Sequence, residues 1–151
     1  MRRVVVTGLG MVTPLGVGVD QNWSQITNGK SGISRIDGFD VSDITCRIAG
    51  QVPGADVDGG LNLDDWIEPR EQRKQDRFIQ LGLVAAIQAV ENSGWKPRDA
   101  EAQNRTGVMI GSGIGGLDTI VQTDHLMNQR GTRRISPFFI PSALINLISV
   151  Y

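Results

Sequence analysis

The segment GSGIGG, Gly111 to Gly116, has the glycine spacing of loops that bind the pyrophosphate of a dinucleotide. In such proteins an acidic residue at the end of the next strand, about 20 residues further on, binds the ribose. Here that stretch is RGTRRISPFF, which holds three arginines and no acidic residue. One hypothesis is therefore an NADP-binding oxidoreductase domain, with an arginine for the 2′-phosphate. The alternative is that the glycines let the backbone pack closely beside an interior cavity.

Candidates for nucleophilic or metal chemistry are few. Cys46 is the single cysteine and lies in ITCRIAG, a strand-like context that predicts a small buried or edge residue. His125, the single histidine, follows Asp124 in a predicted helix, where neighbouring side chains point about 100° apart and do not form a dyad. One cysteine and one histidine do not make a metal site. We therefore predict no catalytic residue, no metal and no cofactor in this chain.

Positive charge gathers in two short segments of a chain whose net charge is −1. REQRKQDR, residues 70–77, holds four basic and two acidic residues, and RGTRR, residues 130–134, forms a second basic cluster. A near-neutral chain with local basic clusters argues against nucleic acid and favours a small acidic partner, the alternative being two solvated faces. No apolar run reaches the roughly 18 residues of a membrane span, so we expect no membrane segment and a cytoplasmic protein.

The elements that must position these residues alternate between strand and helix. The consecutive valines 4–6 predict a buried strand in RRVVVTGLG, and TGVMIGS predicts a second. The strongest helix is DRFIQLGLVAAIQAVENSG; apolar residues cover nearly its whole circumference, so we expect it to be buried on most sides until Gly94 ends it. Weaker patterns predict a helix capped by Asp20, a strand in TCRIAGQV, helical turns in LDDWIEPREQRK, a helix over 117–128 and a helical tail. This order predicts an α/β protein with a central sheet.

Five motifs together carry a resemblance to one family. RRVVVTGLGMVTPLG, SGIS, REQRKQDRFIQ, GSGIGGL and RRISPFFIPS occur in the order seen in the β-ketoacyl-[acyl-carrier-protein] synthases, and the match is closest to the type II condensing enzymes of bacterial fatty acid synthesis. The resemblance implies a thiolase-like, layered α-β-α-β-α fold, of which residues 1–151 form the N-terminal part of the first half. It also implies a homodimer that catalyses decarboxylative Claisen condensation of an acyl thioester with malonyl-acyl carrier protein.

The same resemblance implies roles for particular residues. The glycine segment borders the acyl tunnel, with Ile114 beside the growing chain, and Phe139 reaches into the acyl pocket of the partner subunit. A positive surface near the pocket entrance docks the acidic acyl carrier protein. The residues that match this surface are Arg70, Arg73, Lys74, Arg133 and Arg134.

The resemblance also indicates what this chain lacks. In the family, the cysteine nucleophile and two catalytic histidines lie beyond SPFFIPS, and neither Cys46 nor His125 matches them. The family usually has glycine directly after the position of Ser149, whereas here Val150 and Tyr151 follow. We therefore expect the isolated chain to be inactive in condensation. A non-catalytic module that binds carrier protein through its arginines is a further alternative.

Overall fold

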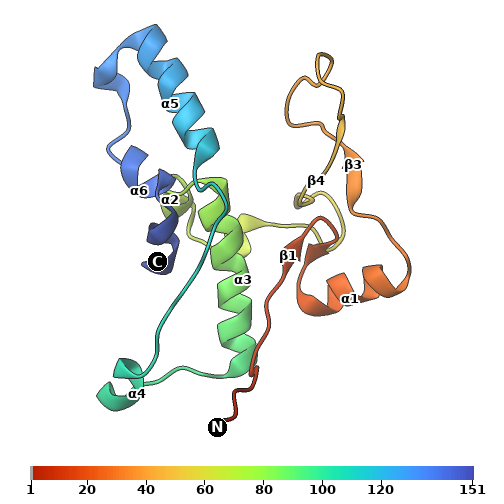
Figure 1. Ribbon diagram of the computed structural model, residues 1–151, viewed down its shortest axis with the longest axis vertical. Coiled ribbons are helices and arrows are strands. Elements are labelled where there is room, and N and C mark those ends of the chain that lie inside the picture. The colour runs from red at the N-terminus through yellow and green to blue at the C-terminus, as the bar shows by residue number, and fades with distance from the viewer. Residues whose placement is uncertain (1) are drawn as a thin grey trace.

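A 17-residue helix, α3 (Arg77–Ser93), runs through the middle of the computed structural model, which describes residues 2–151 (Figure 1). The side chain of Asp76 caps its first turn, and Gly94, with φ of 67°, ends it in the left-handed conformation. The helix forms where the sequence predicts it. Its Val84 is fully buried against Leu61 and Ile67, and these three residues form the centre of the core.

The apolar circumference of α3 is covered only in part. Ile79 and Val84 are fully buried, but Val90 near the C-terminal end is 46% exposed. The expectation that this helix is buried on most sides is therefore confirmed for its N-terminal half and wrong for its last turns.

The remaining helices are shorter and lie around α3. The helix α1 begins after Gly18 rather than at Asp20, so the predicted aspartate cap is wrong, and Gly29 follows it with φ of 67°. The helix α5 confirms the prediction over residues 117–128 and is two residues longer. The helical bounds are α1 Val19–Thr27, α2 Pro69–Gln72, α4 Ala100–Asn104, α5 Leu117–Arg130 and α6 Phe139–Ala143, with 3-10 helices at Leu63–Asp65, Thr132–Arg134 and Ile145–Ser149.

Two short antiparallel pairs make up the strands of residues 2–151. One is a hairpin of β1 (Val12–Thr13) and β2 (Gly16–Val17), and the other pairs β3 (Ile33–Arg35) with β4 (Ile48–Gly50), Ser34 lying opposite Ala49. The strand β4 confirms the strand predicted in TCRIAGQV. Cys46, two residues before it, is exposed, so of the two predicted positions, buried or at an edge, the buried one is wrong.

The two predicted buried strands are wrong, and residues 2–151 contain no central sheet. Val4 is 91% exposed and Met109 is 97% exposed, each in an extended segment. The N-terminal segment runs beside α3 instead of beside a strand (Figure 1). The backbone N–H of Leu9 donates to the Asn92 side chain at 3.1 Å and that of Met11 to the Gln88 side chain at 3.3 Å. Side chains of a helix thus accept bonds that a neighbouring strand would accept in a sheet.

Candidate functional site

The glycine segment, residues 111–116, has two halves with different surroundings. At Gly111 and Gly113 an added Cβ would have no atom of residues 2–151 within 4 Å. At Gly116 it would lie 2.6 Å from the Cα of Ala143, and the Gly116 N–H donates to the Ala143 carbonyl at 3.1 Å. Close packing of the glycines is therefore confirmed for the second half, which is anchored on α6, and is wrong for the first half.

We expect Gly116→Ala to lower the free energy of unfolding by about 1–3 kcal/mol, because the new methyl group would overlap backbone atoms that cannot rotate away. Gly113→Ala is the matched control, and it should change stability by less than about 0.5 kcal/mol. Urea denaturation of both variants, followed by circular dichroism, measures the difference. Equal losses in the two variants would contradict the asymmetry of the segment.

A buried carboxylate joins the glycine segment to the end of the basic segment. Asp76 is only 8% exposed, and its Oδ1 accepts from the backbone N–H of Phe78 at 3.3 Å. Its Oδ2 accepts from the backbone N–H of Thr119 at 3.0 Å and from the Thr119 hydroxyl at 2.6 Å. Thr119 lies in the first turn of α5, whose cap residue, Gly116, has no side chain. Asp76 therefore caps both α3 and α5.

The sequence showed half of this arrangement. An aspartate directly before a long apolar helix is the usual signal of an N-cap, so the bond of Asp76 to Phe78 could have been predicted. Thr119 is 43 residues further along the chain, and no local pattern indicates that it meets Asp76.

The second cap argues against a dinucleotide at the glycine segment. A pyrophosphate in such a loop binds the free N–H groups at the start of the following helix. Here the carboxylate of Asp76 already accepts from Thr119 in the first turn of α5, and its negative charge would repel a phosphate. The segment before the glycines is extended without pairing within residues 2–151, whereas a dinucleotide loop follows a strand.

The five predicted docking residues come from two regions. Arg70, Arg73 and Lys74 lie in or directly after α2, while Arg133 and Arg134 lie in the 3-10 helix after α5. The four arginines are exposed. Within residues 2–151, Arg73, Arg133 and Arg134 form no ion pair, so their charges are available to a partner.

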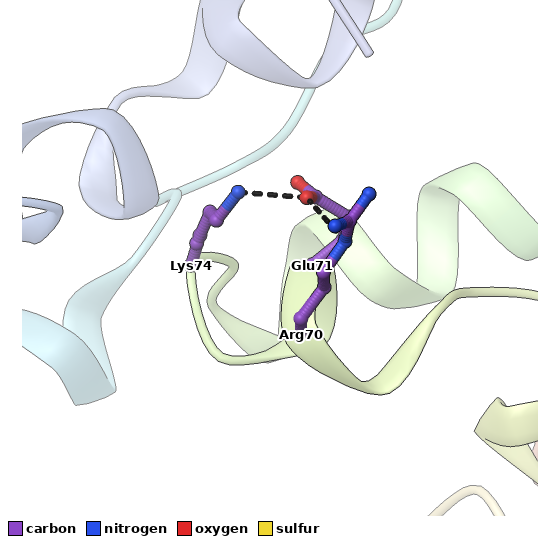
Figure 2. A network of polar contacts seen from close by, with 3 residues as sticks. All are labelled: Arg70, Glu71 and Lys74. Atoms are coloured by element: carbon purple, nitrogen blue, oxygen red, sulfur yellow. Dashed lines mark hydrogen bonds and ion pairs between the residues drawn. The ribbon is translucent and has the colours of Figure 1, made fainter.

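Lys74 is held by two neighbours and is only partly exposed. Its Nζ lies 2.7 Å from Oε1 of Glu71, and the same ammonium group lies 5.6 Å from the centroid of the Phe138 ring. Figure 2 shows Glu71 between Lys74 and Arg70, whose Nε is 3.7 Å from the same carboxylate oxygen. The contact with Phe138 links the first basic region to the loop before α6.

Glu71 reduces the positive charge of the first region. The hydrogen bond from Lys74 is the largest effect on Glu71 and lowers the pKa of its carboxyl group; partial desolvation opposes this, and the charges of Lys74 and Arg70 add to the lowering. The carboxylate therefore stays ionised at neutral pH and offsets part of the charge of its two neighbours. Sequence reasoning had counted all five basic residues as equal.

Of the two predicted acyl-site residues, one precedes α5 in the sequence and the other follows it. Ile114, in the free half of the glycine segment, is 69% exposed, and Phe139 is the partly buried first residue of α6. Gly116 packs on Ala143 of α6, so the glycine segment and α6 are in contact. Together with Asp76 and Lys74, these contacts gather residues 70–77, 111–119 and 138–145 into one region.

Other chemistry has little support in this region. His125 is exposed on α5, and no group of three potential metal-binding side chains occurs in residues 2–151. In the same part of the chain, each helix is too short or too polar to cross a membrane.

Residues 1–150 match the family described as beta-ketoacyl synthase, N-terminal domain. The chain is 50% identical over 148 residues to 3-oxoacyl-[acyl-carrier-protein] synthase 2 of Rhizobium meliloti (strain 1021), an alignment that covers 97% of this chain and 35% of that protein. The chain therefore belongs to the beta-ketoacyl synthase family, as its five motifs predict. It spans about a third of the length of the curated relatives that it matches.

Solved structures show the same fold. A beta-ketoacyl synthase from Burkholderia phymatum STM815 is similar with a TM-score of 0.76 at 24% identity, over 99% of this chain and 36% of that chain. A structure of a type II PKS acyl-carrier protein in complex with its ketosynthase bound to the hexaketide gives 0.69 at 22% identity, over 99% and 37% of the two chains. These likenesses confirm the predicted fold class, the N-terminal part of a thiolase-like fold, although its strand segments 2–11 and 106–112 run unpaired in the described residues.

Proposed function

We propose that this chain is the N-terminal segment of a 3-oxoacyl-[acyl-carrier-protein] synthase of fatty acid biosynthesis. This enzyme is an acyltransferase that carries out decarboxylative Claisen condensation. In that reaction malonyl carrier protein loses CO2, and the carbanion equivalent attacks an acyl thioester to form the new carbon–carbon bond. The proposal is supported by the family and by the names of the curated relatives. We assign docking and acyl binding to this chain's residues, and the bond-making steps to none of them.

The carrier-protein site in this proposal is centred on Arg73, Arg133 and Arg134. The observation that carries it is the contact of Lys74 with Phe138, because this contact joins the first basic region to the loop that leads from the second basic region to α6. Lys74 and Arg70 share the carboxylate of Glu71, so we assign them a smaller part in attraction. Exposed charge pairs contribute about 0.2–1 kcal/mol each, so several must act together.

Reversing both Arg133 and Arg134 to glutamate should weaken binding of acyl carrier protein about tenfold at low salt, because two attractive pairs become repulsive. The dissociation constant, measured by fluorescence anisotropy at low and high salt, should also depend less on salt than in the wild type. The matched control reverses Arg35 and Arg98, which are exposed on β3 and near α4. Equal weakening in both double variants would contradict a local docking site.

Condensing activity can be tested in a hybrid protein. The aligned part of this chain would replace the matching segment of the Rhizobium meliloti relative, with which it is 50% identical over 148 residues. We expect the hybrid to release CO2 from malonyl carrier protein and to form the 3-oxoacyl product. A correctly folded hybrid without product would contradict the proposed function.

The acyl site and the dimer belong to the same proposal. Ile114 would face the growing acyl chain, and Phe139 would reach into the acyl pocket of a second subunit. Exposed apolar residues on α6 and directly beside its two ends support an interface there, since Phe138 is 42%, Ile140 56% and Leu144 45% exposed. We propose that the full-length synthase is a homodimer in the cytoplasm, whose mass in solution by light scattering should be twice that of one subunit.

A further inference from the structure

We propose that Asp76 is a positioning residue that couples the carrier-docking surface to the glycine segment. This inference rests on the proposed function, because it assigns the docking surface to carrier protein. Its carboxylate ties the start of α5 to the end of the basic segment, so that carrier protein bound at the arginines also restrains residues 111–116.

The first support is the way in which one carboxylate is shared between two helices. Its two oxygens accept three hydrogen bonds, one from Phe78 in α3 and two from Thr119 in α5. A negative charge at the N-termini of two helices is favourable for both helix dipoles. Asp76 as a whole residue is 8% exposed, so water competes little for these bonds.

The second support is the position of Asp76 beside the anchored half of the glycine segment. An added Cβ at Gly116 would lie 3.2 Å from Oδ2 of Asp76, so the anchored half of the glycine segment touches this carboxylate. The other half, with Gly111, Gly113 and the exposed Ile114, is unpacked against residues 2–151. Asp76 therefore contacts the glycine segment in its anchored half, next to the half that has no packing contacts.

The third support is the connection to the docking surface. Lys74, two residues before Asp76, contacts Glu71 of α2 and the ring of Phe138 before α6. The anchored half of the glycine segment packs on Ala143 of α6. A partner held at Arg73 therefore lies three residues from Asp76 and beside the elements that contact the glycine segment, while Arg133 and Arg134 follow the C-terminal end of α5.

The test compares Asp76→Asn with the wild type by hydrogen exchange of the purified protein, with and without acyl carrier protein. The asparagine keeps the size and one acceptor oxygen, but its NH2 group cannot accept from Thr119. In the free protein we expect amide exchange at Thr119 to become at least tenfold faster. Carrier protein should slow exchange of residues 111–116 in the wild type, and it should not slow it in the variant, although affinity changes less than about twofold.

Two variants of Thr119, the residue that donates hydrogen bonds to Asp76, test the coupling without changing Asp76 itself. Thr119→Ser retains the hydroxyl donor and should behave as the wild type, whereas Thr119→Val loses it and should weaken the carrier effect on residues 111–116. If Asp76→Asn does not fold, this pair decides the question. A role in capping alone would change stability and leave the carrier effect in place, and that outcome would overturn the inference.

Failure of the inference and failure of the proposed function give different results. Unchanged Thr119 exchange in Asp76→Asn, or a carrier effect that persists in this variant, overturns the inference while carrier binding still supports the proposed function. A wild-type protein that does not bind carrier protein overturns both the docking assignment and the coupling. Faster Thr119 exchange in the free variant would then still support the structural tie between Asp76 and α5.

Discussion

Replacing Ile79 with alanine should lower the free energy of unfolding by about 2–5 kcal/mol. Ile79 lies in the first turn of α3 and is 0% exposed, so the shortened side chain leaves a cavity in addition to the lost burial of its methyl and methylene groups. The same turn holds Asp76 at its cap, so the loss acts where α3 meets α5. Urea denaturation monitored by circular dichroism gives the free energy from the midpoint and slope.

Ile26→Ala provides the matched control for this cavity. Ile26 is also on a helix, α1, but is 54% exposed, so the same chemical change removes little buried surface. We expect a loss below about 1 kcal/mol. A loss at Ile79 no larger than that at Ile26 would show that the start of α3 is not packed as described.

Gly10→Ala should also be strongly destabilising, with a loss at or above the 1–3 kcal/mol that is typical of overpacking. A Cβ at Gly10 would collide with the carbonyl oxygen of Ala85 and would lie 2.8 Å from the backbone nitrogen of Ala89, both in α3. Backbone atoms of a helix cannot move aside without breaking its hydrogen bonds. The N-terminal segment would therefore have to leave α3 and give up the bonds of Leu9 and Met11 to the helix side chains.

Gly38→Ala separates this collision from the general effect of replacing glycine. An added Cβ at Gly38 would have no atom of residues 2–151 within 4 Å, and its backbone conformation is open to alanine. We expect a change within about 0.5 kcal/mol, of either sign, since alanine also restricts the unfolded chain. Thermal unfolding of the two variants, side by side, measures the difference. A neutral Gly10→Ala would contradict the close approach of this segment to α3.

The site could be predicted from sequence only where a family motif carried it. The motifs located the glycine segment, Phe139 and the basic residues, but they gave all the basic residues the same weight. The structure separates them, because Glu71 offsets part of the charge of Arg70 and Lys74, whereas Arg73, Arg133 and Arg134 form no ion pair within residues 2–151. Asp76 was missed as a site residue, since half of its role depends on Thr119, which is distant in the sequence.

The sequence by itself determined the two longest helices and the family. Three local signals specify α3: the apolar run from Phe78, the aspartate before that run, and Gly94 after it. The residues from Leu117 onward specify α5. Helices can be predicted in this way because their hydrogen bonds join residues four apart and depend on local composition. Tertiary structure decided whether the strand-like segments pair into a sheet. The valines 4–6 favour an extended backbone, but a strand exists only where a second strand meets its hydrogen-bonding edge, and here α3 lies beside that segment. Tertiary structure likewise brought Asp76 to Thr119, because a contact over 43 residues depends on how the helices pack.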